Sequence, residues 1–378
     1  MWCYMCKISN TILTSTILTS TISVFIGIVF LSCFLFIASA QPYQANQANQ
    51  KTIQVSQTQQ LYAALRHANK FGYTHIVLAD GMYNVHKTLL IKNDHVTLSS
   101  LSANREKVVI SGRGMRKTKG VDNLIRVSGK HFTLDGITLQ QAGNHLVQIA
   151  GEQDADFPIL RNCVLRDGYE QLLKVSYNRK TKISSDNGLI ENCEFTYTEG
   201  IGPQYYIGGI DVHGGHNWVV RRSVFRGIAS PSSRIAEHAI HFWNNTQNTL
   251  VEDNIIINCD RGIGFGMTNR PNMGGLIQNN LILHSANSHP SADVGIILEE
   301  SPNTKILNNK IYLAHSYRNA IEYRFPSTVN VEISGNLTNK EIRKRDGASA
   351  VLLNNTRSKS LDDFLTTKQL TSLRLQFN

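Results

Sequence analysis

A short pattern of hydrophobic and polar positions recurs along the chain: an apolar residue, two variable residues, a small residue or asparagine, a variable residue and a second apolar residue. Eight segments carry it, and their fourth positions are Ile137, Cys163, Cys193, Ser223, Asn254, Asn280, Asn309 and Asn336. Successive positions are 26 to 31 residues apart. A period of this length, with short β-rich segments and no helical pattern between them, predicts a solenoid of parallel strands.

A second set of segments lies between these repeats and alternates apolar with polar residues, as in GIDVHG, AIHFWN and AIEYRF. Alternate side chains of a strand point to opposite faces. The inward residues form two apolar columns, Ile210, Ile240, Ile263, Ile296 and Ile321, then Val212, Phe242, Phe265, Leu298 and Tyr323. The outward residues form two further columns that we expect to face solvent: Lys174, Asp211, His241, Gly264, Ile297 and Glu322, then Ser176, His213, Trp243, Gly266, Glu299 and Arg324.

The four asparagines of the first pattern would occupy one turn in consecutive coils. Strands in a sheet lie about 4.8 Å apart, so each side-chain amide can bond to the amides above and below it. We therefore predict a buried asparagine ladder with a structural role.

Both ends of the repeat region carry segments suited to covering the terminal core and strand edges of a solenoid. Leu61, Ala64, Leu65 and Ala68 recur at helical spacing in the segment 56–72, which predicts an amphipathic cap helix. Leu361, Phe364, Leu365 and Leu370 suggest a C-terminal cover. The expected divisions are an N-terminal segment and cap helix at 41–72, about ten coils at 73–356, and a C-terminal tail or cap at 357–378.

Residues 1–40 are set apart by the apolar run VFIGIVFLSCFLFI, which ends in ASA just before Gln41. This pattern is typical of a secretory signal peptide, and an uncleaved membrane anchor is the alternative. We predict a secreted protein, extracellular or periplasmic, with no membrane association after cleavage.

Cleavage would leave Cys163, Cys193 and Cys259, which are too few for a disulfide framework. Cys163 and Cys193 occupy equivalent positions in consecutive coils. We expect stacked, buried thiols there, because a bridge between neighbouring rungs would strain the sheet.

The net charge of +10 falls to +9 when Lys7 is removed with the signal, so the mature chain should attract polyanions. Zinc-finger spacing, aromatic RNA-binding signatures and basic helices are missing from the sequence, which argues against nucleic acid. For a secreted chain, acidic polysaccharide is the expected partner, and we expect a monomer.

The N-terminal helix, the strand-like IVLADGMYNV that follows it, the degenerate coils and the asparagine ladder together resemble the secreted right-handed parallel β-helix proteins of the pectin-lyase-like superfamily. The resemblance covers nearly all of residues 52–356. It implies an all-β, single-stranded right-handed parallel β-helix. It also implies chemistry on acidic polysaccharides, because the superfamily includes pectate, alginate and chondroitin lyases, epimerases and polygalacturonases.

A uronate lyase must neutralise the substrate carboxylate, remove the neighbouring C5 proton and assist the departure of O4. The outward columns hold suitable groups. The candidate catalytic residues are His241 and His213 for proton transfer, with Lys174 and Arg324 as partners of the carboxylate. The candidate substrate-binding residues are Trp243, Tyr205, Tyr206, Arg234 and His238, the last two near Glu237 in one loop. Asp211, Glu299 and Glu322 are the candidate ligands of a Ca²⁺ ion.

Other interpretations remain open at this point. Glu322 and Arg324 also fit a surface ion pair, and Trp243 also fits packing beneath a loop. The function can be that of a lyase, an epimerase, a glycoside hydrolase using Asp211 with Glu299 or Glu322, or a non-catalytic glycan-binding adhesin. A polar cluster that crosses several coils favours an enzyme, because an adhesin would more typically repeat one binding residue on every coil.

Overall fold

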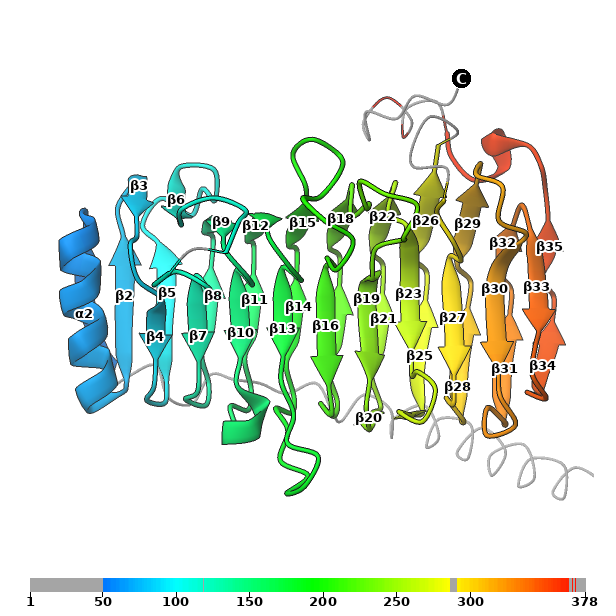
Figure 1. Cartoon of the computed structure of the whole chain (residues 1–378), viewed down its shortest axis with the longest axis horizontal. Helices are drawn as coiled ribbons and strands as arrows, with labels where there is room; N and C mark the ends of the chain where they lie inside the picture. The colour runs from blue at the N-terminus through cyan, green and yellow to red at the C-terminus, as the bar shows by residue number, and fades with distance from the viewer. Residues whose placement is uncertain (1–49, 118, 286–290, 367–368, 370, 372–378) are drawn as a thin grey trace, which may run out of the picture. The chain divides into compact units, whose positions relative to one another are not determined.

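The computed structural model describes residues 50–117, 119–285, 291–366, 369 and 371. From Lys51 onward the chain coils through three long parallel sheets, and each coil except the first and the last contributes a strand to each sheet in turn (Figure 1). It is an all-β solenoid of about ten turns, as the repeat pattern predicts. The signal-peptide prediction for residues 1–40 lies outside the described residues.

The twelve-stranded sheet contains β1 (Lys51–Val55), β2 (Thr74–Leu78), β5 (Val96–Ser100), β8 (Thr133–Asp135), β11 (Ile159–Arg161), β14 (Leu189–Glu191), β17 (Val219–Arg221), β21 (Leu250–Glu252), β25 (Gly275–Gln278), β28 (Thr304–Leu307), β31 (Val331–Ser334) and β34 (Ala350–Leu353). The eleven-stranded sheet contains β3 (Gly81–Asn84), β6 (Val108–Ser111), β9 (Thr138–Ala142), β12 (Val164–Gly168), β15 (Glu194–Thr196), β18 (Val224–Arg226), β22 (Ile255–Ile257), β26 (Leu281–His284), β29 (Lys310–Leu313), β32 (Leu337–Thr338) and β35 (Thr356–Arg357).

The ten-stranded sheet carries the alternating segments of the sequence. Its strands are β4 (Leu89–Ile91), β7 (Ile125–Val127), β10 (Val147–Ile149), β13 (Leu173–Val175), β16 (Ile210–His213), β19 (His238–Trp243), β23 (Arg261–Phe265), β27 (Ile296–Glu299), β30 (Asn319–Arg324) and β33 (Glu341–Lys344). A short pair, β20 (Thr246–Gln247) and β24 (Asn272–Met273), completes the strands of the described residues.

The predicted register of the ten-stranded sheet is confirmed. Ile210, Ile240, Ile263, Ile296 and Ile321 are paired in sequence from strand to strand, and all five are fully buried. The second column, from Val212 to Tyr323, is likewise inside. Because the coils stack in register, each inward side chain packs on an equivalent one above and below, and one continuous apolar core results.

The asparagine ladder is also confirmed. Asn254 donates from Nδ2 to Oδ1 of Asn280 at 3.0 Å, and the same bond continues through Asn309 and Asn336. Asn336 in turn donates to Asn355 at 2.9 Å, a fifth member that the repeat pattern did not include. These amides satisfy one another and nearby backbone carbonyls inside the core, where an unbonded amide would be costly.

A residue in the left-handed backbone conformation precedes each of the eight repeat positions from Ile137 to Asn336, and at five of them it is asparagine or aspartate. The backbone φ is 55° at Asn162, 53° at Asn192, 54° at Asp253, 55° at Asn279 and 55° at Asn308. Asparagine and aspartate tolerate this conformation better than most residues. Glycine holds the same place before Ile137 and Asn336, and Arg222 holds it before Ser223 with a φ of 50°, so the turn favours asparagine, aspartate or glycine there without requiring one.

The helix α2 (Thr58–Phe71) covers the N-terminal end of the solenoid as predicted (Figure 1), burying Leu61, Ala64, Leu65 and Ala68. It ends at Gly72, whose φ of 66° suits glycine and whose N–H donates to the carbonyl of Ala68. One difference from expectation is β1, which precedes the helix and pairs with β2. In the described part of the chain, no helix is long and apolar enough to cross a membrane.

The C-terminal segment packs elsewhere than expected. Phe364 and Leu365 are buried against Leu283 of the eleven-stranded sheet, so they cover its outer side. Val351 and Leu353 of the last coil stay exposed. Leu370 lies outside the described residues.

Cys163, Cys193 and Cys259 are buried free thiols, in agreement with the expectation for the first two. Cys163 and Cys193 each donate to backbone carbonyls of the turn. Burial raises the pKa of Cys163 well above its ordinary value, and its neighbour Cys193 acts in the same direction. The Cys163 thiol therefore stays protonated in the apolar interior.

The stacked core gives a stability prediction. Ile263→Asp places an unpaired carboxylate between Ile240 and Ile296, and we expect it to cost more than about 4 kcal/mol of the free energy of unfolding. The matched control is Ile297→Asp, which adds the same charge at an outward, partly exposed position of the next coil. Urea unfolding followed by circular dichroism measures both. Equal losses in the two variants would contradict the register.

Candidate functional site

The outward residues of β13, β16 and β19 form a polar cluster, and most of it is buried. The register aligns Lys174 with Asp211 and His241, and His213 with Trp243, as predicted. However, Asp211 and His241 are each 5% exposed and Trp243 is 9% exposed. The expectation that these columns face solvent is therefore wrong for these three, because neighbouring side chains cover one another across a rung spacing of only about 4.8 Å. It is also wrong for Gly264, Gly266 and Glu322, which are buried as well.

Asp211 is the centre of this cluster. Its Oδ2 accepts a hydrogen bond from the Lys174 ammonium, and its Oδ1 accepts one from the Trp243 indole N–H at 2.6 Å. His213 Nε2 lies 3.5 Å from Oδ1. Burial alone would raise the pKa of Asp211, but Lys174 and His213 outweigh it and hold that pKa well below its ordinary value. Asp211 is therefore a fixed negative charge.

Lys174 and His213 are the members of the cluster that keep access to solvent. Their side chains are 14% and 18% exposed, and Lys174 Nζ lies 2.9 Å from His213 Nε2. The other ring nitrogen, Nδ1, lies 3.3 Å from the Asn244 amide. Burial lowers the pKa of His213, although Asp211 partly opposes the shift. At neutral pH the ring is therefore a neutral imidazole that can take up a proton.

The Trp243 ring was expected to face solvent and stack on a sugar, but it packs among neighbouring side chains. His241 stacks on its ring at 5.3 Å with an interplanar angle of 5°, and the Arg270 guanidinium lies 4.8 Å from the ring centroid. His213 contacts the same ring edge-on at 4.2 Å. With so little of the ring exposed, the geometry favours packing and the hydrogen bond to Asp211 over a sugar-stacking platform.

His241 and His238 are both buried, and their rings lie 4.4 Å apart. His241 Nε2 lies 3.1 Å from the carbonyl oxygen of Gly266, and burial lowers its pKa to about 4. Burial also lowers the pKa of His238 well below its ordinary value. Proton exchange with a substrate is harder to assign to His241 than to His213, because the substrate would have to reach a covered ring.

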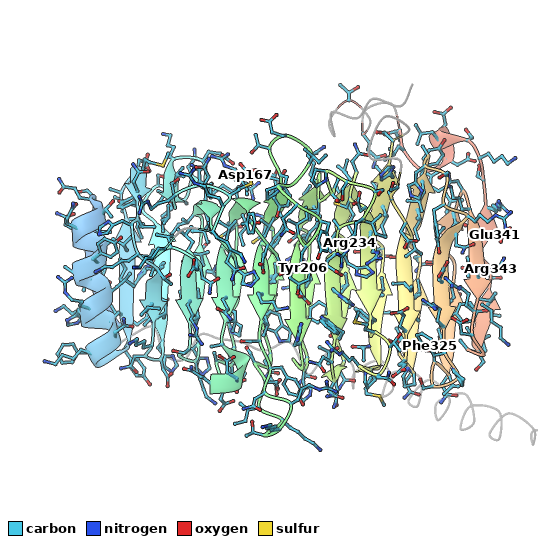
Figure 2. The ribbon with its side chains drawn as sticks, in the orientation of Figure 1. Asp167, Tyr206, Arg234, Phe325, Glu341 and Arg343 are labelled. Carbon is cyan, nitrogen blue, oxygen red and sulfur yellow. The ribbon has the colours of Figure 1, made fainter. Side chains whose placement is uncertain are left out.

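The loop residues predicted to bind substrate lie on the face of the ten-stranded sheet. Figure 2 labels Tyr206 and Arg234 in the part of the view that the ten-stranded sheet occupies, and the rings of Tyr205 and Tyr206 lie 6.4 Å apart. The Arg234 guanidinium lies 3.6 Å from the centroid of the Tyr205 ring. Tyr206 is 40% exposed, and burial of the rest raises its pKa, with Lys174 and Asp211 near enough to influence it. An exposed aromatic phenol therefore stands beside the polar cluster.

Arg324 and the other two predicted carboxylates lie elsewhere on the sheet. Arg324 bonds to Glu299 at 2.8 Å and to Asp346 at 2.7 Å. Glu322 is buried and accepts hydrogen bonds from Tyr317, Asn319 and Arg345. Glu322 and Arg324 therefore pair with other residues and not with each other.

These placements bear on the predicted Ca²⁺ site. Asp211 and Glu322 belong to the same outward column but are four rungs apart, or about 19 Å at the usual strand spacing. Asp211, Glu299 and Glu322 each already have a cationic partner. The three carboxylates therefore do not form one calcium site, and a calcium requirement stays a prediction without this ligand set.

Several residues of the site were not identified from the sequence. Arg261 lies 3.7 Å from Glu237 and 3.6 Å from Asp293, Arg270 covers Trp243, and Asn244 contacts His213. Arg261 starts the strand next to β19 and pairs with His238, so the register could have indicated it. Arg270 comes from a loop, and its sequence carried no such signal.

The chain resembles known proteins in structure but not in sequence. No family model matches it, and no curated protein sequence matches it. Among solved structures, it is similar to an alginate lyase from Paenibacillus sp. str. FPU-7, with a TM-score of 0.58 and 14% identity over 80% of this chain and 99% of that one. It is also similar to the catalytic domain of a GH87 alpha-1,3-glucanase, with a TM-score of 0.50 and 12% identity over 84% of this chain and 60% of that one.

At such low identity these similarities concern the path of the backbone alone. They agree with the three-sheet parallel coil described above and with the handedness implied by the sequence resemblance. The chain is a right-handed parallel β-helix protein.

Proposed function

We propose that this protein is a secreted polysaccharide lyase that cleaves an acidic, uronate-containing polysaccharide by β-elimination on the face formed by β13, β16 and β19. The observation that carries the proposal is the contact of Lys174, Asp211 and His213 across two neighbouring coils, with the exposed Tyr206 beside it. A cation, a neutral imidazole and a protonated phenol are thereby gathered at one place. Each is suited to one step of the elimination.

Lys174 and the exposed Arg234 are the groups proposed to bind the substrate carboxylate. Neutralising that carboxylate makes the neighbouring C5 proton easier to remove, because negative charge develops toward it in the transition state. Asp211 balances the charge of Lys174 in the free protein and holds its ammonium in place. Arginine adds a planar pair of donors that matches a carboxylate.

His213 is the proposed base, and Tyr206 is the proposed acid. When Lys174 binds the substrate carboxylate, it gives up its hydrogen bond to Nε2 of His213 and frees that lone pair. His213 then takes the C5 proton at Nε2, the C–H electron pair forms the C4–C5 double bond, and the C4–O4 bond breaks. Tyr206 then gives its phenolic proton to the leaving O4. His213 is neutral and Tyr206 is protonated at neutral pH, so both begin in the state that the step requires.

A glycoside hydrolase is less well supported by the same geometry. Hydrolysis requires two carboxyl groups that reach the scissile bond, one of them able to donate a proton. Asp211 is buried, ion-paired and strongly acidic, so it is unsuited to donate. The similar solved structures include a lyase and a glucanase, so their names do not decide between these chemistries.

The first functional prediction concerns the reaction. Incubation of the protein with alginate, pectate or chondroitin, with and without Ca²⁺, should yield unsaturated uronate ends from at least one substrate, measured by ultraviolet absorbance. New reducing ends without unsaturation would identify a hydrolase. Binding of a uronan with neither signal would identify a non-catalytic glycan-binding protein and overturn the proposal.

The second concerns the proton-transfer residues. His213→Ala and Tyr206→Phe should each lower kcat by about 10²- to 10⁴-fold, which is the usual contribution of general acid or base catalysis. His216→Ala and Tyr177→Phe are the matched controls, since His216 pairs with Asp186 and Tyr177 bonds weakly to Asn245. Thermal melting checks folding. Full turnover in folded His213→Ala would remove that residue from the mechanism.

The third concerns pH. His213 must be neutral to act as a base, and its pKa lies below the ordinary value of 6.5. The value of kcat/KM should therefore fall on the acid side only below pH 6.5. Tyr206 must be protonated to act as an acid, and its pKa lies above 10.0, so the alkaline fall should lie above pH 10.0. An acid limb centred above pH 6.5 in a pH–rate profile would contradict the assignment of His213.

A further inference from the structure

Three potential metal ligands converge where β19 begins. One ligand atom from each of Glu237, His238 and His241 lies within 4.8 Å of the other two. Among the described residues this is the one group of three or more such side chains close enough to hold an ion. A single backbone segment of five residues carries all three, at positions 237, 238 and 241.

His238 is the member that most needs an explanation. Its side chain is 7% exposed, and both of its ring nitrogens are buried with no hydrogen-bond partner in the described part of the chain. A buried polar group without a partner loses its hydration and gains nothing in return. A bound ion would supply the missing partner for one of these nitrogens.

The contact between His241 and Gly266 determines which ring nitrogen of His241 carries the proton. A backbone carbonyl oxygen only accepts hydrogen bonds, so the contact of 3.1 Å with Gly266 places a proton on Nε2 of His241. The neutral ring then keeps its lone pair on Nδ1. Metal-binding histidines usually donate their second ring nitrogen to a carbonyl or carboxylate in this way.

The neighbouring strand makes room for His238. A Cβ atom at Gly264 would lie 2.7 Å from His238 Nε2, which is closer than side chains approach. Glycine at this outward position of β23 therefore leaves a space that the imidazole ring fills.

The charges around the three ligands are mixed. Arg261 lies 3.7 Å from the Glu237 carboxylate and opposes a cation, while Glu237 and nearby Asp211 favour one. The Glu237 side chain is 31% exposed, so an ion can reach the cluster from that side. Two neutral imidazoles and one carboxylate match the donor set of many zinc sites that keep a position open.

We propose that Glu237, His238 and His241 bind one divalent transition-metal ion of the Zn²⁺ class. Two imidazole ligands favour Zn²⁺, Co²⁺ or Ni²⁺ over Ca²⁺, which prefers oxygen ligands. Donor atoms around a tetrahedral zinc ion lie about 3.3 Å apart, so binding draws the three side chains slightly together. The proposal goes beyond the lyase function and is independent of it, since the ligands differ from Lys174 and His213.

The experiment measures binding itself. The protein is stripped with a chelator, dialysed and titrated with ZnCl₂ by calorimetry, and with CoCl₂ while the visible spectrum is recorded. We expect one equivalent of Zn²⁺ to bind, a Co²⁺ spectrum typical of tetrahedral coordination, a higher Tm with Zn²⁺, and no displacement by Ca²⁺. No Zn²⁺ binding, or displacement by equimolar Ca²⁺, would overturn the proposal.

Two variants test the ligands. Glu237→Gln and His238→Asn should each weaken Zn²⁺ binding by about 100-fold or more, because loss of an outer-shell partner alone typically costs about 10- to 100-fold. Glu237→Gln changes a partly exposed carboxylate to an isosteric amide, so it tests the site even if His238→Asn fails to fold. The matched control is His216→Asn, in a separate histidine–carboxylate pair with Asp186. Unchanged affinity in folded Glu237→Gln, or an equal loss in His216→Asn, would assign the ion elsewhere.

Discussion

The structure depends on one constraint: parallel strands of successive coils pair in register at a spacing of about 4.8 Å. This pairing repeats each residue type above and below itself, so a buried isoleucine meets isoleucine and a buried asparagine bonds to asparagine. The energy of the fold is therefore distributed along the solenoid axis, with each coil stabilised by its two neighbours. A residue out of place in one coil affects three.

The same constraint shapes the chemistry of the outer face. Side chains that point outward from adjacent strands lie within contact distance of one another. Polar groups placed there must therefore satisfy one another's charges and hydrogen bonds. Lys174, Asp211 and Trp243 do so through direct hydrogen bonds. Asp211 becomes a buried anion of depressed pKa without leaving the outer side of the sheet. An outward direction and exposure to solvent are thus separate properties in a β-helix.

Two neighbouring groups with different chemistry result from this crowding. Lys174 and His213 keep partial exposure and can meet a substrate, whereas His238 and His241 are covered and face each other. Trp243 connects the two groups, since its N–H bonds to Asp211 and its ring stacks on His241. An ion held by the histidines would therefore stiffen the support of the Lys174 and His213 cluster through packing alone.

The sequence by itself determined the coil period, the inward columns, the asparagine ladder and the N-terminal cap helix. Each of these depends on local residue pattern, because strand alternation and helical spacing fix which side chain is inside. It also aligned Lys174, Asp211 and His241 across coils, since parallel register follows from the repeat. It did not determine which outward side chains are covered by other parts of the chain. Only the tertiary structure decided that His241 and Trp243 are buried and that Arg270 and Arg261 reach the site. It also decided that Glu322 pairs with Arg345. Loops and long side chains from other coils make these contacts, and no periodic pattern in the sequence records how far they reach.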